Sequence, residues 1–151
     1  MAFLLSQVGA RTAQLFAAQI APLGITPRAF AILSNLGARQ PQTQQQLADG
    51  LGIHRNNMVS LIDELEASGW VRRHRSPDDR RAFEIHLTTA GREVVTQVNA
   101  LVVSLNEELA GALAPAERAA FTSQLTRIAQ SLELESAIHP HVAGRAHASP
   151  P

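Results

Sequence analysis

The sequence contains no cysteine and no lysine, and each absence excludes several kinds of chemistry. Without cysteine there is no disulfide framework, no thiol redox switch, no cysteine nucleophile and no thiolate metal site. Because all thirteen basic side chains are arginine, Schiff-base lysines and phosphate-loop lysines are excluded as well. A formal net charge of zero over 151 residues gives no global argument for binding nucleic acid or a membrane surface. Any such function has to follow from where the charges lie.

Long apolar runs are also missing. None approaches the roughly 18 residues that a membrane span requires. The N-terminal stretch has no basic segment before its apolar residues and is interrupted by Arg11, so we expect no signal peptide. We therefore expect a cytoplasmic protein without a membrane partner. The hydrophobic content of 45% favours a folded chain, and the length suits one globular domain or one compact domain with a helical extension.

Apolar residues at spacings of three and four predict six helices along the chain. Local signals mark where four of them begin: Thr26 followed by Pro27, Thr43, Thr88 and Pro115. Thr43 with a glutamine three residues later is a capping box. Between Gly69 and Thr88 the period changes to two, which predicts a hairpin of strands 70–75 and 83–87 around a polar, arginine-bearing turn.

Two short helices joined by a glycine-containing turn and followed by a hairpin are typical of a winged helix-turn-helix. A major groove about 12 Å wide admits one helix, so we expect the polar start of the second short helix to contact base edges. Arginine can bind O6 and N7 of guanine, and asparagine can bind N6 and N7 of adenine. The exposed polar side chains expected there are His54, Arg55, Asn56, Asn57 and Ser60.

Several segments occur in a characteristic order: 24–27, 47–48, 51–53, 61–66, 69–71, 77–81 and 87–91. In these segments, from residue 25 to 91, the sequence resembles the MarR family of winged-helix transcription regulators. The specific feature is Asp-Arg-Arg at 79–81 followed at this spacing by Leu-Thr-x-x-Gly. The outer helices extend the resemblance by arrangement to about residues 1 to 133.

The resemblance implies a mainly α fold with a small β-hairpin wing (α+β). The winged helix-turn-helix core would span residues 25–91, with dimerisation helices at 1–24 and 112–137 and a long linking helix at 88–112. Residues 138–151 are rich in His, Pro, Ala, Ser and Gly, which predicts a disordered tail.

The resemblance also assigns roles to single residues. Arg81 would enter the minor groove, and Asp79 would orient it by a salt bridge. The predicted DNA contacts are Thr43, Gln44, Arg55, Asn56, Asn57, Ser60, Arg73, Arg80 and Arg81. Members commonly have Ser or Thr where this chain has His54, and Pro or Ala where it has Asn56; these differences concern the operator sequence, not the fold.

Several alternatives stay open on the sequence. Arg72, Arg73 and Arg75 are either the solvated face of the hairpin or phosphate contacts. The asparagines at 56 and 57 are either helix-start residues or base contacts. The Val and Leu stripe of the fifth helix is either ordinary core or, with the first and sixth helices, a dimer interface. A homodimer would place two recognition helices about 34 Å apart on a pseudo-palindromic operator in double-stranded DNA.

The resemblance further implies repression that a small, often aromatic or phenolic, ligand relieves. Candidate pocket residues are Phe16, Phe30, Leu33 and Trp70. The alternative is a ligand-sensing or protein-interaction module that has lost DNA binding.

No enzyme is expected. The chain has no His-Glu-x-x-His motif, no Gly-x-Ser-x-Gly elbow and no glycine-rich phosphate loop after a strand. We expect no cofactor and no metal, since His139, His141 and His147 fall in the predicted tail.

Charge is unevenly distributed within the neutral total. Residues 1–56 carry four arginines and one aspartate (+3), and residues 93–151 carry three arginines and six glutamates (−3). Residues 57–92 carry six charges of each sign. This distribution predicts a basic DNA-facing side and an acidic helical end.

Overall fold

The structure is a computed structural model that describes residues 1–39, 41–77 and 82–134. The predicted tail 138–151 lies outside these residues. In chain order the elements are α1 (Ala2–Ile20), the 3-10 turn η1 (Ala21–Leu23), α2 (Pro27–Ala38), β1 (Gln42–Thr43), α3 (Gln44–Gly50), α4 (Arg55–Ala67), β2 (Val71–Arg75), β3 (Phe83–Leu87), α5 (Thr89–Ala110) and α6 (Pro115–Ser131). The mainly α fold with a β wing is confirmed.

The predicted helix starts at Thr26 and Thr88 are confirmed by side-chain caps. The Thr26 hydroxyl accepts a hydrogen bond from the backbone N–H of Ala29 at the start of α2. The Thr88 hydroxyl accepts one from the backbone N–H of Gly91 at the start of α5. Such caps satisfy amide groups that a helix leaves without an internal partner, and each contributes about 1 kcal/mol.

The wing sheet has three strands, in the order β1-β3-β2, and both pairings are antiparallel. The prediction of a two-stranded hairpin was therefore incomplete. The added strand β1 pairs Gln42 with Ile85 and Thr43 with Glu84. Two residues carry no period-two signal, which is why the sequence pattern did not predict this strand.

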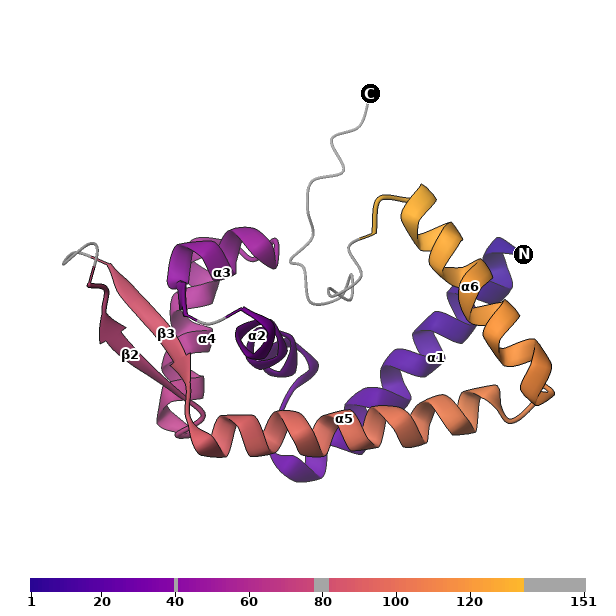
Figure 1. Cartoon of the computed structure of the whole chain (residues 1–151), viewed down its shortest axis with the longest axis horizontal. Coiled ribbons are helices and arrows are strands. Elements are labelled where there is room, and N and C mark those ends of the chain that lie inside the picture. Colours follow the sequence, from indigo (N-terminus) through magenta and orange to yellow (C-terminus); the bar gives the residue numbers. More distant parts are fainter. Residues whose placement is uncertain (40, 78–81, 135–151) are drawn as a thin grey trace.

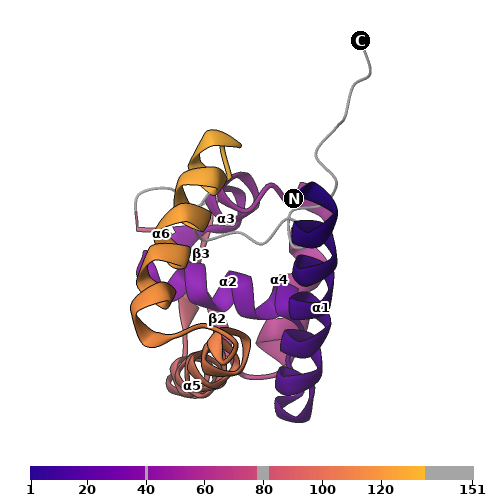
Figure 2. The same ribbon diagram turned by 90° about the vertical axis from the view of Figure 1, so that its right-hand side faces the viewer.

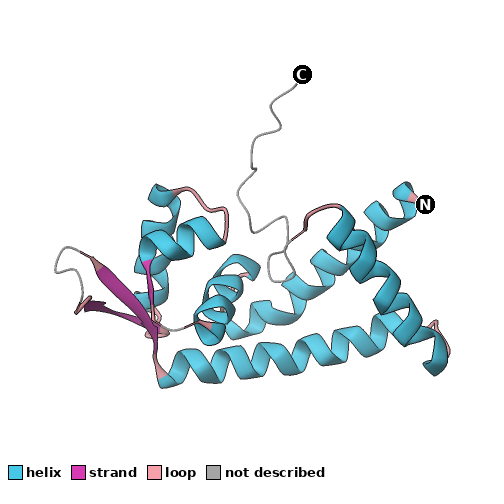
Figure 3. Cartoon of the chain, turned by 45° about the horizontal axis from the view of Figure 1, so that its top comes forward, coloured by secondary structure: helices cyan, strands magenta, loops and turns pink. Residues whose placement is uncertain are grey.

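Figure 1 shows α5 running from the sheet at one end of the molecule to α6 at the other, with α1 beside it. Figure 3 shows that all strands lie at the same end. We call residues 25–91 the winged unit, and α1, α6 and the part of α5 after Val98 the helical end. The hydrophobic core lies mainly in the winged unit, where Ile32, Leu33 and Leu36 of α2 are fully buried.

Thr88 and Gly91 attach α5 to the winged unit. The Thr88 hydroxyl donates to the Gly69 carbonyl oxygen at 2.7 Å, and the Thr88 backbone N–H donates to the Trp70 carbonyl at 3.0 Å. A Cβ atom at position 91 would lie 2.1 Å from the Trp70 carbonyl oxygen. Only glycine permits this approach, which gives the Leu-Thr-x-x-Gly segment a steric reason.

Within the described ranges, no single helix is both long and apolar enough to cross a bilayer; only α1 and η1 taken together with α2, a pair bent by 79°, reach the necessary length and composition.

Candidate nucleic-acid interface

The start of α3 is held by its own side chains and by the sheet. The Thr43 hydroxyl accepts from the Gln46 backbone N–H at 3.2 Å, and the Thr43 N–H donates to Gln46 Oε1 at 2.8 Å. This is the predicted capping box. Because Thr43 also pairs with Glu84 in the sheet, the wing and the first helix of the helix-turn-helix share a fixed boundary.

The recognition helix α4 is anchored from one side. Met58, Ile62 and Leu65 are buried at spacings of four and three, so the opposite face points to solvent. The four candidate side chains predicted on that face are all exposed: Arg55, Asn56, Asn57 and Ser60.

His54 caps α4 at the position where the resemblance led us to expect Ser or Thr. Its Nδ1 accepts a hydrogen bond from the Asn56 backbone N–H at 3.3 Å. The imidazole thus satisfies one free amide of the helix start. The departure at this position preserves the start of the recognition helix.

A hollow of about 440 Å³ lies between the start of α3, the start of α4 and the beginning of β3. Its lining includes four of the predicted DNA contacts, Thr43, Gln44, Arg55 and Asn56. The remaining lining residues are Gln45, Val59, Ala82 and Phe83, which the sequence analysis did not predict. The fold therefore gathers polar side chains from the starts of α3 and α4, and apolar ones from α4 and the start of β3, on one surface beside the wing.

Arg73 of β2 binds the recognition helix. Its guanidinium forms ion pairs with Asp63 and Glu66 of α4, each at an N···O distance of 2.5 Å. The Arg73 backbone N–H also donates to Glu66 Oε1 at 3.1 Å. This backbone hydrogen bond, and then the guanidinium, lower the pKa of Glu66.

These bonds place Arg73 between the wing and α4. Its charge is balanced inside the chain, whereas the sequence analysis predicted a DNA contact for this residue. That contact stays a prediction. The sequence analysis missed the two carboxylate partners, although Asp63 and Glu66 are three residues apart and so share one helix face.

The other face of the sheet carries a histidine pair. The His74 and His86 rings meet edge to face, with centroids 4.9 Å apart. Glu84 lies beside them, with its Oε2 3.4 Å from His86 Nε2 and its Oε1 2.8 Å from the Ser76 hydroxyl. In the part of the chain that the structure describes, no three His, Asp or Glu side chains are arranged to hold a metal ion.

Comparison with known proteins assigns the family. The MarR family pattern matches residues 23–82. The chain is 34% identical to the transcriptional repressor CouR, whose structure was solved bound to a 23-mer DNA duplex; the match covers 85% of this chain and 92% of that one, with a TM-score of 0.75. The chain belongs to the MarR family.

Two further relatives have somewhat lower identity. A mutant MarR from E. coli, solved in complex with operator DNA, is 27% identical with a TM-score of 0.71, and the match covers 84% of this chain and 91% of that one. A putative transcriptional regulatory protein for the hcr operon of Thauera aromatica is 27% identical over 105 residues. That match covers 70% of this chain and 63% of the Thauera protein.

Membership of this family of transcription regulators confirms the winged helix-turn-helix fold and the expectation that the chain is not an enzyme. Three wing residues predicted for this MarR-family protein, Asp79, Arg80 and Arg81, lie outside the described residues. Their roles stay predictions.

The predicted ligand-pocket residues pack in or against the hydrophobic core. Phe16 and Phe30 meet edge to face with ring centroids 5.8 Å apart. Leu33 is fully buried, and Trp70 is half-buried against the same core. The structure thus brings Phe16 and Phe30 together, half-buried against the core.

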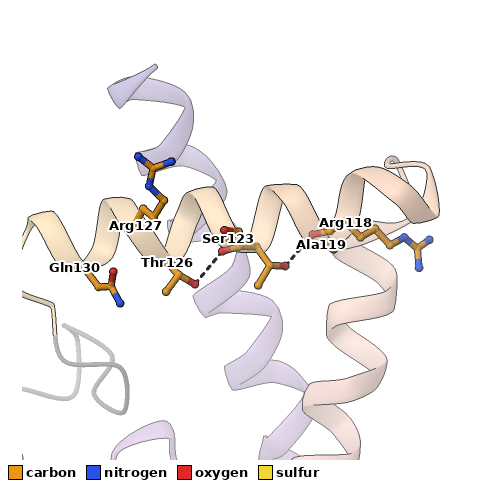
Figure 4. Close-up of a pocket in the computed structure, with 7 residues that line it drawn as sticks. Arg118, Ala119, Ser123, Thr126, Arg127 and Gln130 are labelled. Carbon is orange, nitrogen blue, oxygen red and sulfur yellow. Dashed lines mark hydrogen bonds between the residues drawn. The ribbon is translucent and has the colours of Figure 1, made fainter.

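A second hollow lies along α6 at the helical end, and Figure 4 shows its lining. Its volume is about 690 Å³, and it is open to solvent. The lining side chains are small or polar: Arg118, Ala119, Thr122, Ser123, Thr126, Arg127 and Gln130. It contains none of the predicted pocket residues.

Proposed function

We propose that this MarR-family protein is a sequence-specific, double-stranded DNA-binding transcription regulator that acts in the cytoplasm. The observation that carries the proposal is the hollow beside the wing. It joins Arg55 and Asn56 at the exposed start of α4 with Thr43 and Gln44 at the start of α3. Guanidinium and amide groups are the side chains that bind purine edges in the major groove.

Two relatives support DNA as the partner, since CouR was solved on a 23-mer duplex and a mutant E. coli MarR with operator DNA. The charge distribution also favours DNA contact through the winged unit. Residues 1–56 sum to +3 and residues 93–151 to −3. The acidic C-terminal segment 93–151 is repelled by phosphates, so the winged unit before it would face the DNA.

We propose that the protein acts as a homodimer joined through its helical end. None of the α6 side chains, all of which belong to the described residues, is buried. Figure 2 shows α6 standing apart from α1. Large apolar side chains are exposed on both helices: Phe3, Leu4, Leu5, Val8, Phe121 and Ile128. A second copy would cover them and place two α4 helices on a pseudo-palindromic operator.

We further propose that the protein is a repressor that a small aromatic or phenolic ligand releases. CouR is a transcriptional repressor, and Phe16 and Phe30 form an aromatic contact where α1 meets the winged unit. A ligand that opened this contact would shift α1 against α2 and change the spacing of the two α4 helices in the dimer.

The test is a gel shift on the chain's own upstream promoter at fixed salt, with wild type, Arg81→Ala and Arg127→Ala. Loss of the predicted minor-groove contact in Arg81→Ala should cost about 1–3 kcal/mol of binding free energy. Arg127 lies on α6 at the helical end, so its removal should leave the affinity within about twofold, as expected when no phosphate contact is lost.

Unchanged affinity in Arg81→Ala would contradict the role of the wing. Absence of a specific shift on this promoter and on a genomic fragment library would favour the alternative, an interaction module without DNA binding.

A further inference from the structure

Val59 is an exposed apolar side chain on the recognition helix. Met58, Ile62 and Leu65 of the same helix are buried and Leu61 is half-buried, whereas Val59 is 40% exposed. Single exposed apolar residues are common on protein surfaces. The position of Val59 inside the hollow beside the wing is what distinguishes it.

Val59 shares one face of α4 with the polar candidates. It lies three residues after Asn56 and four after Arg55, spacings that place side chains next to each other on a helix. All three line the same hollow. A DNA edge that meets Arg55 and Asn56 therefore also meets the valine methyl groups.

Phe83 provides the second apolar surface of the hollow. It is 43% exposed at the start of β3, and the Arg75 guanidinium carbon lies 5.5 Å from its ring centroid. A ligand that fits this hollow would place polar groups against Arg55 and Asn56 and an apolar group against Val59 and Phe83. Along the major-groove edges of the four bases, the apolar group is the C5 methyl of thymine.

We propose that Val59 is a specificity-determining residue that contacts the C5 methyl of a thymine in each operator half-site. The inference rests on the proposed function, and it names thymine as the base that Val59 recognises. Arg55 and Asn56 would bind neighbouring purines, while Val59 would exclude water from the thymine methyl. Cytosine at that position would leave Val59 without an apolar partner.

The experiment begins with selection of duplexes from a random library by the wild-type protein at fixed salt. Each thymine of the selected operator is then replaced singly by deoxyuridine, which removes only the C5 methyl. At one thymine of each half-site the wild-type affinity should fall about fourfold, the effect of withdrawing one methyl-sized apolar group from its contact.

Val59→Ala should bind thymine and deoxyuridine operators equally at that position. Alanine favours helix more than valine, and the site is exposed, so the variant should fold. Val103→Ala is the matched control, because Val103 is an exposed valine of α5 in the helical end. It should keep the fourfold difference between thymine and deoxyuridine.

A thymine difference that persists in Val59→Ala, or a selected operator in which no thymine methyl matters, would overturn this inference and leave DNA binding intact. Failure to select any duplex over random DNA would instead overturn the proposed function.

Discussion

The winged unit and the helical end differ in how fully a single chain buries their apolar side chains. In the winged unit, α2, α3, α4 and the sheet surround one core in which residues such as Ile32, Leu47 and Ile85 are fully buried. In the helical end, α6 buries no side chain and the first half of α1 is exposed throughout. Both regions have helices with clear apolar positions. The difference supports the proposed homodimer, in which a second copy would cover the apolar surface of the helical end.

The two regions also differ in their ion pairs. Arg73 in the winged unit contacts two carboxylates and its side chain is 20% exposed. Arg118 in the helical end pairs with Glu107 at 2.8 Å, with side chains 34% and 69% exposed. Charges that are partly shielded from water interact more strongly than exposed ones. We therefore expect the Arg73 ion pairs to hold α4 against β2 more firmly than the Arg118–Glu107 pair holds α6 against α5.

The largest effect is expected from charges placed on the helical end. Leu4→Glu and Ile128→Glu should dissociate the proposed dimer, because each substitution is repeated across a symmetric interface and a buried Leu or Ile contributes about 1.5–3 kcal/mol. Sedimentation at micromolar concentration measures the loss of dimer. Ala67→Glu, at an exposed position of the winged unit, should remain dimeric. A monomeric wild type would contradict the proposal that a second copy covers the helical end.

A smaller effect is expected at the junction of α5 with the winged unit. Gly91→Ala places a Cβ 2.1 Å from the Trp70 carbonyl oxygen, so backbone must move. We expect the free energy of unfolding to fall by about 3 kcal/mol, as overpacking in a core does. Urea denaturation measures it. Gly37→Ala is the control, since its Cβ would meet Leu87 at an ordinary 3.8 Å; an equal loss in both variants would contradict the steric explanation.

The coupling energies of the ion pairs in the two regions should differ by about 1 kcal/mol. In double-mutant cycles on urea denaturation, Arg73→Ala with Glu66→Ala should give a coupling energy near 1 kcal/mol. The more exposed pair, Arg118→Ala with Glu107→Ala, should give a value near zero. Equal coupling in the two cycles would show that Arg73 does not hold α4 to the wing more firmly than a surface pair.

The smallest effect concerns pH. The pKa of Glu66 in the folded chain lies below its ordinary value of 4.5, chiefly through the Arg73 backbone N–H. A carboxyl with a lowered folded pKa stabilises the fold above its unfolded pKa, and this contribution is lost as pH falls through the folded pKa. The stability difference between wild type and Glu66→Gln, at most about 1 kcal/mol because solvent still screens the pair, should be constant from pH 7 to 5 and shrink below 4.5. A constant difference down to pH 3 would contradict this assignment.

Much of the fold could be predicted from local signals. Thr26, Thr43 and Thr88 each cap the helix that follows, as predicted, because a cap depends on bonds to residues about three positions away. The alternation in β2 and β3 likewise predicted both strands. By contrast, β1 has two residues, and its pairing with β3 depends on a segment about forty residues later.

The candidate interface was predictable only in part. Arg55, Asn56, Asn57 and Ser60 were predicted as exposed because α4 has a clear buried stripe on its other side. The three arginines of β2 were equivalent in composition, and the structure distinguishes Arg73 by its bonds to Asp63 and Glu66. A strand pattern tells which residues share a face but not which helix packs against that face.

By itself, the sequence determined where helices begin, which strands alternate and that a winged helix-turn-helix with a polar recognition surface would form. Those properties depend on neighbours within a few residues. Only the tertiary structure decided that Thr43, Arg55, Val59 and Phe83 line one hollow and that Arg73 holds α4. These placements depend on packing between segments far apart in the chain, and burial, not local preference, determines them.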